Sequence, residues 1–342
     1  MKSQEFYMQK CLDLACKGIG NVSSNPMVGS VIVHNNKIIG RGYHKKYGST
    51  HAEVNAISSV KDKSLLNKST LYVNLEPCSH YGKTPPCDNL IIKHKIPKVV
   101  IGCMDIFSKV SGKGIQKMKK AGIKVVVGVL EEKSKSLNKR FITFHENNRP
   151  YIILKWAESE DGFIAPNNQT KPFWMTSKES KKLVHKWRSE EDAILIGRIT
   201  AEQDNPSLTV REVKGNNPLR IVIDKNLKLA ATLKILNNKA KTLIFNEIKS
   251  EIKDTNSFIK TNFSNLINNI TRKLHEQNVQ SVIIEGGTTT LQSFIDMNIW
   301  DEARVFTTNK KLKYGVKAPA IKGKTLYVSK IDVDILKIIV ND

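Results

Sequence analysis

Two short windows constrain the fold of this chain more than any other feature: residues 50–56, THAEVNA, and residues 76–87, EPCSHYGKTPPC. Zinc prefers histidine nitrogen and cysteine thiolate, and a catalytic zinc site keeps a fourth position open for water. His51, Cys78 and Cys87 would supply three protein ligands. A chain that uses them must fold so that the first window meets both ends of the second.

A carboxylate accompanies these three residues, because Glu53 follows His51 by two positions. Bound zinc lowers the pKa of a water molecule from about 15.7 toward about 7. Glu53 would carry protons between that water and a leaving amine, and the pattern His-x-Glu…Pro-Cys…Cys is typical of zinc deaminases. The alternative is a closed structural site, which usually has four protein ligands. Only His80, between the two cysteines, could be the fourth, so the pattern favours catalysis.

Helix and strand patterns alternate along the first half, which predicts an α/β layered domain. The expected helices are 6–17, 52–60, 88–94, 114–121 and 131–146, and the expected strands are 28–33, 37–42, 70–76, 98–102 and 123–129. The Asn-Asn-Arg-Pro run at 147–150 interrupts the pattern. We therefore expect a deaminase-type domain in 1–147 and a second domain in 148–342.

The second half again alternates the two patterns. Its expected strands are 151–157, 193–197, 220–224, 242–245, 281–287 and 302–308, and its expected helices are 177–187, 266–277 and 289–297. This predicts a second α/β domain.

Charge and cysteine content bear on location and partners. The formal net charge is +23, and only 9 of the 55 basic residues are Arg, so a lysine-rich surface explains the charge better than nucleic-acid recognition does. No apolar run reaches the roughly 18 residues of a membrane span, and the N-terminus resembles an amphipathic helix, so we expect a cytoplasmic protein. Five cysteines make a disulfide framework improbable, and Cys11, Cys16 and Cys103 are expected to be buried free thiols.

The eight residues between Cys78 and Cys87 resemble the long zinc loop of the bifunctional deaminase–reductase family of riboflavin biosynthesis. Further similar motifs follow in the family's order: NPMVGSVIV (25–33), LNKRF (137–141), WMTS (174–177), TAEQDNPSLTVR (200–211), RIVID (220–224) and IIEGG (283–287). The resemblance covers about residues 5–308. It implies an N-terminal cytidine-deaminase-like α/β/α sandwich and a C-terminal dihydrofolate-reductase-like α/β domain.

The resemblance also implies two reactions on a small phosphorylated pyrimidine. The first is the zinc-dependent hydrolytic deamination of 2,5-diamino-6-ribosylamino-4(3H)-pyrimidinone 5′-phosphate. The second is the NADPH-dependent reduction of the ribosyl group to ribityl, which gives 5-amino-6-(5-phosphoribitylamino)uracil. The expected partners are therefore this substrate, Zn²⁺ and NADPH, with no nucleic acid and no membrane, in a homo-oligomer, either a dimer or a tetramer.

The resemblance assigns roles to individual residues. Glu53 is the catalytic residue, and His51, Cys78 and Cys87 bind the metal. The cofactor-binding residues are Ala157, Trp174, Thr200, Asp204, Gly287, Thr288, Thr289, Thr290, Leu291, Gln292 and Ser293. The substrate-binding residues are Asn25, Arg188, Leu208, Arg211 and Glu285. Taken singly, each has a plainer interpretation: Trp174 as a core aromatic, for example, or Arg211 as a surface charge.

Two positions depart from the family, and two alternatives stay open. The family's Asp-Pro-Asn-Pro turn is replaced by Asp-Ile-Phe-Ser at 105–108, and a substrate-contacting Ser by Pro172. Both changes would weaken affinity without removing chemistry. The first alternative is a nucleic-acid base deaminase of the tRNA-adenosine type with an unrelated C-terminal domain. The second is a non-catalytic zinc protein with a decayed reductase half.

Overall fold

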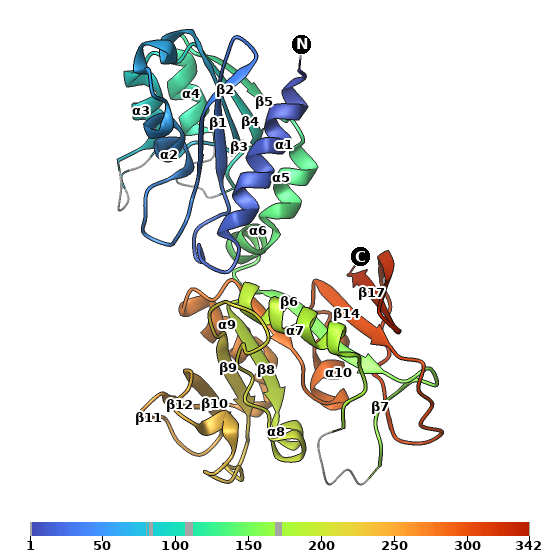
Figure 1. Cartoon of the computed structure of the whole chain (residues 1–342). Coiled ribbons are helices and arrows are strands. Elements are labelled where there is room, and N and C mark those ends of the chain that lie inside the picture. Colours follow the sequence, from blue (N-terminus) through green and yellow to red (C-terminus); the bar gives the residue numbers. More distant parts are fainter. Residues whose placement is uncertain (1, 80, 82–84, 107–111, 168–172, 342) are drawn as a thin grey trace. The chain divides into compact units, whose positions relative to one another are not determined.

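The computed structural model describes residues 2–79, 81, 85–106, 112–167 and 173–341. The chain forms two compact units, Met1–Asn148 and Arg149–Asp342. In each unit, helices cover a central sheet (Figure 1). Within the described ranges, no helix has the length and apolar character needed to cross a membrane.

The first unit is built on a five-stranded sheet with the order β2-β1-β3-β4-β5. β1 pairs antiparallel with β2 and β3, while β3, β4 and β5 are parallel. The strands are β1 (Gly29–His34), β2 (Lys37–Tyr43), β3 (Thr70–Leu75), β4 (Lys98–Cys103) and β5 (Lys124–Val127). All five match strands expected from the sequence. β1, β3 and β4 are almost wholly buried, and strands buried on both faces have nearly continuous apolar sequences.

Helices pack on both faces of this sheet (Figure 1). α1 contributes to the core on one face, and α2, α3 and α4 contribute to the core on the other. The helices of the unit are α1 (Gln4–Ala15), η1 (Cys16–Gly18), α2 (Ala52–Ser59), η2 (Lys63–Lys68), α3 (Cys87–Lys93), α4 (Lys113–Lys120), α5 (Glu131–Leu137) and α6 (Lys139–Glu146). The result is an α/β/α sandwich.

The single helix expected over 131–146 is wrong, because the chain forms α5 and α6 with a break at Asn138. The Asn138 side chain is committed to the backbone of Met27: its Oδ1 accepts the N–H at 2.7 Å and its Nδ2 donates to the carbonyl at 3.0 Å. This contact fixes Asn138 at a ψ of 17°, outside the helical range.

The cysteines agree with the sequence prediction except at one position. All five are free thiols, and Cys11 and Cys103 are buried as expected. Cys16 is exposed, so its predicted burial is wrong. It is the residue after the last turn of α1, where the chain leaves the face that packs on the sheet.

The second unit contains a ten-stranded sheet with the order β11-β12-β10-β9-β8-β13-β6-β14-β17-β16. The strands from β12 to β14 in this order are parallel, and the outer pairs β11–β12, β14–β17 and β17–β16 are antiparallel. Their bounds are β6 (Tyr151–Glu158), β8 (Ala193–Gly197), β9 (Leu219–Ile223), β10 (Thr242–Asn246), β11 (Glu251–Lys253), β12 (Asn256–Lys260), β13 (Ser281–Ile284), β14 (Glu302–Thr307), β16 (Lys324–Ile331) and β17 (Asp334–Val340). A separate pair joins β7 (Phe163–Ala165) and β15 (Val316–Lys317).

Two hydrophobic cores lie on the two faces of this sheet. α9 and α10 pack into one core, and α7 and α8 into the other. The helices are α7 (Lys178–Glu190), α8 (Arg198–Asp204), η3 (Lys234–Leu236), η4 (Phe263–Asn265), α9 (Leu266–Glu276) and α10 (Thr288–Asp296). α7 begins after Ser177, whose hydroxyl accepts the N–H of Ser180 and so caps the helix. The carboxyl ends of the parallel strands share one edge, where α/β sheets bind ligands.

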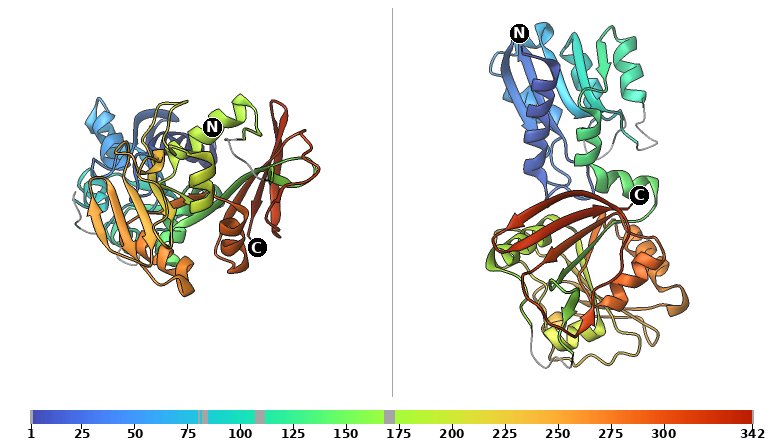
Figure 2. Two further views of the ribbon diagram at one scale, coloured as in Figure 1. Left: turned by 90° about the horizontal axis from the view of Figure 1, so that it is seen from below. Right: turned by 90° about the vertical axis from the view of Figure 1, so that its right-hand side faces the viewer.

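The C-terminal hairpin of β16 and β17 was not expected from the sequence, because no strand was predicted after residue 308. It extends the sheet beyond β14, as Figure 2 shows in red. β16 forms the end of the sheet and exposes about half of each of the apolar side chains Leu326, Tyr327 and Val328.

One fully buried arginine connects two long loops of the second unit. The guanidinium of Arg220, on β9, donates to the main-chain carbonyls of Ser207 (3.3 Å), Lys234 (3.1 Å), Asn237 (2.5 Å) and Ala240 (2.7 Å). Burial lowers its pKa to about 10, so the group stays charged at neutral pH. These bonds satisfy carbonyls that would otherwise be buried without a donor.

We expect Arg220→Met to lower the free energy of unfolding of the second unit by about 3 kcal/mol, because several buried carbonyls lose their donor together. All four tryptophans lie in this unit, so fluorescence during denaturation reports on it alone. Arg272→Met is the matched control: its side chain is 73% exposed, and we expect a change below about 0.5 kcal/mol. Equal stabilities of the two variants would contradict the role given to Arg220.

Candidate active sites

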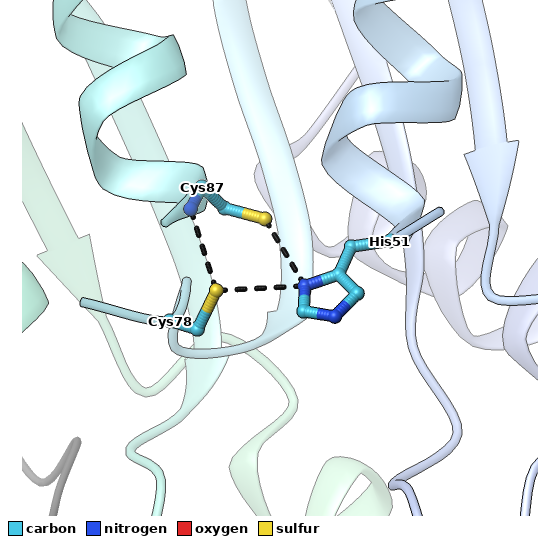
Figure 3. A group of neighbouring side chains, drawn as sticks. All are labelled: His51, Cys78 and Cys87. Carbon is cyan, nitrogen blue, oxygen red and sulfur yellow. Dashed lines mark hydrogen bonds between the residues drawn. The ribbon is translucent and has the colours of Figure 1, made fainter. Parts of the chain in front are cut away.

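Three side chains of the first unit meet as the sequence predicts. His51 Nδ1 lies 3.3 Å from the Sγ of Cys87 and 3.4 Å from the Sγ of Cys78, and Figure 3 shows this nitrogen turned toward both sulfur atoms. Zinc bonds of about 2.0–2.1 Å to nitrogen and about 2.3 Å to sulfur place tetrahedral ligands about 3.5 Å apart. The donor set and the distances therefore fit a zinc ion with three protein ligands.

Helix starts position these ligands. His51 is the residue before α2, and Cys87 is the first residue of α3. Cys78 lies just beyond the end of β3, where its carbonyl accepts the N–H of Asp88 at 3.2 Å and its sulfur accepts the N–H of Cys87 at 3.3 Å. His80 lies outside the described residues.

The carboxyl of Glu53 is buried beside the ligands. Burial, followed by the nearby Cys78, raises its pKa to about 7, and Cys87 hydrogen-bonds to it. Hydrogen bonding by Cys87 and His51 lowers the pKa of Cys78 to about 4, so this sulfur takes the thiolate form that metals bind.

His44 extends this site, although the sequence analysis did not single it out. Its Nε2 lies 3.0 Å from the Nδ2 of Asn25, and its ring meets the ring of His51 edge to face at 5.7 Å. It is buried, and its Nδ1 lies 3.2 Å from the carbonyl of Thr50. The predicted substrate residue Asn25 is thereby connected to the zinc ligands. The signal that was available is a histidine seven residues before His51, at the end of β2.

The second unit has a charged cluster at the carboxyl edge of its sheet. Arg188, from α7, donates to both carboxylate oxygens of Glu285, through Nε at 3.2 Å and Nη2 at 2.6 Å. Lys155, from β6, lies 3.8 Å from the same carboxylate. Glu285 directly follows β13, so its place at this edge follows from the sheet order.

Charge compensation keeps the carboxyl of Glu285 ionised. Burial alone would raise the pKa of Glu285, but the charges of Arg188 and Lys155 lower it to about 2. Burial lowers the pKa of Lys155, and Glu285 and Asp204 partly offset this. Lys155 was not expected at this site from the sequence, although a single lysine in the apolar run YIILKWA was a usable signal.

The predicted substrate residues Leu208 and Arg211 lie on the segment after α8. The side chain of Leu208 is buried in the core and its φ is +53°, so only its main chain is placed for a ligand. Arg211 is exposed, its Nη1 donates to Thr209 Oγ1 at 3.2 Å, and its N–H donates to His185 Nδ1 at 3.2 Å.

The predicted cofactor segment begins α10. The N–H of Gly287 donates to Thr200 Oγ1 at 2.9 Å, which joins two predicted cofactor residues. A Cβ on Gly286 would lie 2.6 Å from the N of Gly197, so the two strand ends approach too closely for a side chain. The first-turn N–H groups of a helix suit phosphate. Leu291 is not placed to bind a phosphate, because its side chain is buried in the core and its N–H donates to the carbonyl of Gly287.

The other predicted cofactor residues lie at the same edge or near it. Ala157 is the penultimate residue of β6, and Asp204 is the last residue of α8. Trp174 is 64% exposed, so the alternative that it is a core aromatic is wrong, and Lys181 lies 5.0 Å from its ring centroid. Gln292 and Ser293 lie in the second turn of α10. The Pro172 departure falls outside the described residues.

Comparison with protein families matches the two units to different families. Residues 1–103 match the cytidine and deoxycytidylate deaminase zinc-binding region, and residues 150–312 match the RibD C-terminal domain. The match to a reductase domain leaves the nucleic-acid base deaminase with an unrelated second domain unsupported.

Relatives match along nearly the whole chain. Riboflavin biosynthesis protein RibD of Aquifex aeolicus is 40% identical over 316 residues, which cover 91% of this chain and 88% of that protein. RibD of Synechocystis is 37% identical over 331 residues, covering 95% and 89%.

Solved structures of other proteins are also similar to nearly the whole chain. The diaminohydroxyphosphoribosylaminopyrimidine deaminase/5-amino-6-(5-phosphoribosylamino)uracil reductase of Thermotoga maritima has a TM-score of 0.91 at 35% identity, covering 99% of this chain and 98% of that chain. Acinetobacter baumannii RibD has a TM-score of 0.91 at 30% identity with the same coverage.

These matches confirm the fold expected from the resemblance, a cytidine-deaminase-like domain followed by a dihydrofolate-reductase-like domain. They also confirm zinc and NADPH as the cofactors of the two domains. The chain belongs to the RibD family of bifunctional deaminase–reductase enzymes of riboflavin biosynthesis.

Proposed function

We propose that the first unit deaminates 2,5-diamino-6-ribosylamino-4(3H)-pyrimidinone 5′-phosphate and that the second reduces the product to 5-amino-6-(5-phosphoribitylamino)uracil. The observation that carries this proposal is the pairing, in one chain, of the His51, Cys78 and Cys87 cluster with the Arg188–Glu285 cluster. The name of the similar Thermotoga protein supports the same two steps. We assign deamination to residues 1–147 and reduction to residues 148–342, in line with the family matches.

In the deaminase, Glu53 is the proton carrier. Zinc, held by His51, Cys78 and Cys87, supplies a Lewis acid that lowers the pKa of water. Glu53 takes one proton of this water and gives it to a ring nitrogen as the oxygen adds to the amino-bearing carbon. It then takes the proton that remains on the added hydroxyl and gives it to the departing amine. Asn25, held by His44, binds the pyrimidine. One water enters, and ammonia leaves as an amine becomes an oxo group.

Glu53→Gln should abolish ammonia release and retain zinc, because the amide keeps the shape of the side chain but cannot carry the proton. The measurement is ammonia production from the diamino substrate, beside zinc content by elemental analysis. Glu132→Gln is the control: this carboxylate is 90% exposed in the same unit, and normal ammonia release is expected. Ammonia release at the wild-type rate by Glu53→Gln would remove Glu53 from this role.

In the reductase, NADPH supplies the hydride. We assign its phosphates to the start of α10, at Gly287, Thr288, Thr289 and Thr290. The hydroxyl of Thr200 accepts the N–H of Gly287 and so fixes the main chain where this segment begins. The phosphate-binding segment ends before Leu291, because the side chain of Leu291 is buried in the core. We also assign Ala157, Trp174 and Asp204 to the cofactor, because they match cofactor-contacting positions of the family.

The substrate of the reductase meets the charged cluster. Because Nε and Nη2 of Arg188 bond Glu285, the bidentate grip on the substrate phosphate falls to the exposed Arg211, and Arg188 adds positive charge. The main chain at Leu208 borders the pyrimidine. Glu285 faces the sugar, where its fixed carboxylate orients the group that receives the hydride.

Glu285→Gln should lower the kcat of NADPH oxidation at least about tenfold and leave ammonia release unchanged. The amide no longer balances the buried charges of Arg188 and Lys155, and the deaminase site belongs to the other unit. Both activities are measured on the same protein. Glu160→Gln, at an exposed ion pair with Lys311, is the control and should match the wild type. A normal kcat in Glu285→Gln would show that the carboxylate charge is not needed.

We also propose that the chain forms a homo-oligomer through its C-terminal hairpin and works in the cytoplasm. The edge strand of the sheet, β16, exposes Leu326, Tyr327 and Val328. An apolar sheet edge of this kind is a template for pairing with a second copy of the chain. Five free cysteines, two of them zinc ligands, favour a reducing compartment.

Val328→Asp should shift the protein toward the monomer in sedimentation velocity, because a charge would be buried when two copies pair. Ile252→Asp is the matched control at the opposite end of the sheet, where the isoleucine is 80% exposed on β11. The control should keep the wild-type distribution. Identical distributions for the two variants would place the interface elsewhere.

A further inference from the structure

His185 is a buried histidine beside the charged cluster that the assignments above leave without a task. It lies within α7, three residues before Arg188, and is 2% exposed. Residues three apart lie on the same face of a helix. Its charge state also influences the pKa of Glu285, so the ring lies close to the Arg188–Glu285 pair.

The ring accepts a hydrogen bond from the substrate-binding segment. The N–H of Arg211 donates to Nδ1 of His185 at 3.2 Å. A main-chain N–H only donates, so Nδ1 carries no proton, and the neutral ring has its proton on Nε2. A proton on Nδ1 would turn the acceptor into a donor and break this bond.

The surroundings keep the ring neutral. Burial, followed by the positive charges of Arg188 and Arg211, lowers the pKa of His185 to about 4. Lys181 acts in the same direction and Glu212 in the opposite one. Nδ1 is therefore an acceptor throughout the neutral pH range, and the hydrogen bond to Arg211 is maintained.

The neighbouring contacts show what this bond fixes. The N–H of Val210 donates to Asn217 Oδ1 at 2.9 Å, and the Arg211 guanidinium donates to Thr209 Oγ1 at 3.2 Å. These bonds are made within the segment and its continuation, whereas two contacts join the segment to α7: the bond to the buried His185, which holds the main chain of Arg211, and an ion pair at 3.2 Å between the half-exposed side chains of Lys181 and Glu212. The bond to His185 thereby fixes the position of the main chain from which the exposed Arg211 side chain extends.

We propose that His185 is a positioning residue of the reductase: it fixes the main chain of Arg211 against α7, so that the Arg211 guanidinium is preorganised for the substrate phosphate. The inference rests on the proposed function, which places Arg211 against that phosphate. Fixing the segment before binding reduces the conformational entropy that is lost when the phosphate is held. His185 itself touches no reacting atom.

Three substitutions separate the acceptor from the bulk of the ring. His185→Asn keeps an amide oxygen near the place of Nδ1, His185→Gln places its oxygen nearer to that of Nε2, and His185→Leu fills the volume with no acceptor. His34→Leu is the matched control, since His34 Nδ1 lies 3.1 Å from the carbonyl of Lys68 in the first unit.

The measurement is steady-state NADPH oxidation with the deaminated phosphorylated pyrimidine and with the same compound lacking phosphate. His185→Leu and His185→Gln should raise KM for the phosphorylated compound roughly three- to tenfold, the equivalent of one hydrogen bond. In these two variants, kcat and the KM for NADPH should stay within about twofold of the wild type. In His185→Asn and His34→Leu, kcat and both KM values should stay within the same range. Without the phosphate, the KM of His185→Leu should equal that of the wild type, which a general structural defect would not produce.

Several results would overturn the inference while the wild type remains active. They are an unchanged KM in His185→Leu and His185→Gln, a loss of kcat in place of the KM effect, or an equal loss with the phosphate-free compound. If His185→Leu does not fold, the comparison of Asn with Gln decides the question. A wild-type protein that releases ammonia but oxidises no NADPH with this substrate would instead overturn the proposed reductase function.

Discussion

Both sites depend on one constraint, the junction at which a buried strand ends and a helix begins. In the first unit, Cys78 follows β3, and His51 and Cys87 begin helices. In the second, Glu285 follows β13, and α10 begins three residues later. Neighbouring strands bring such junctions to one edge, and the first turn of each helix has N–H groups without helical partners. Residues far apart in the sequence therefore meet with unused donors beside them.

The two sites differ in how much of each is complete without a ligand. The Glu285 carboxylate already bridges Arg188 and Lys155, so the buried part of the reductase site is fixed by its own charges. Arg211 is exposed and is held through its main chain and through Thr209. Under the proposed function, a substrate phosphate adds charge at this exposed end, where desolvation costs least, and leaves the buried pair intact.

The sequence could predict most elements and the zinc ligands, because both depend on local patterns. Apolar runs marked the inner strands, and the residue types and spacing of His51, Cys78 and Cys87 are specific to metal binding. The break at Asn138 depends on a contact with Met27, 111 residues away, and no local pattern records it. Lys155 stands out locally as a lone lysine in an apolar run, but its partner Glu285 follows another strand, and no local pattern records that contact.

The C-terminal hairpin was missed for a different reason. Half-buried strands are recognised by alternation, and the consecutive exposed residues Leu326, Tyr327 and Val328 hide that period. The register shift between Thr325 and Tyr327 disturbs the alternation further.

Residues 107 and 108 of the departure at 105–108 lie outside the described residues, but the residues on either side of them are described. The carboxylate of Glu76 accepts N–H groups from Asp105 at 3.3 Å and from Gly112 at 3.0 Å, so it holds the chain on both sides of the replaced turn. Losing prolines adds conformational freedom to a segment, but fixed ends limit how much. The zinc ligand Cys78 is placed by β3 and by its bonds to Cys87 and Asp88, none of which involve this segment. Within the described residues, the contacts that place Cys78 therefore come from β3 and from the start of α3.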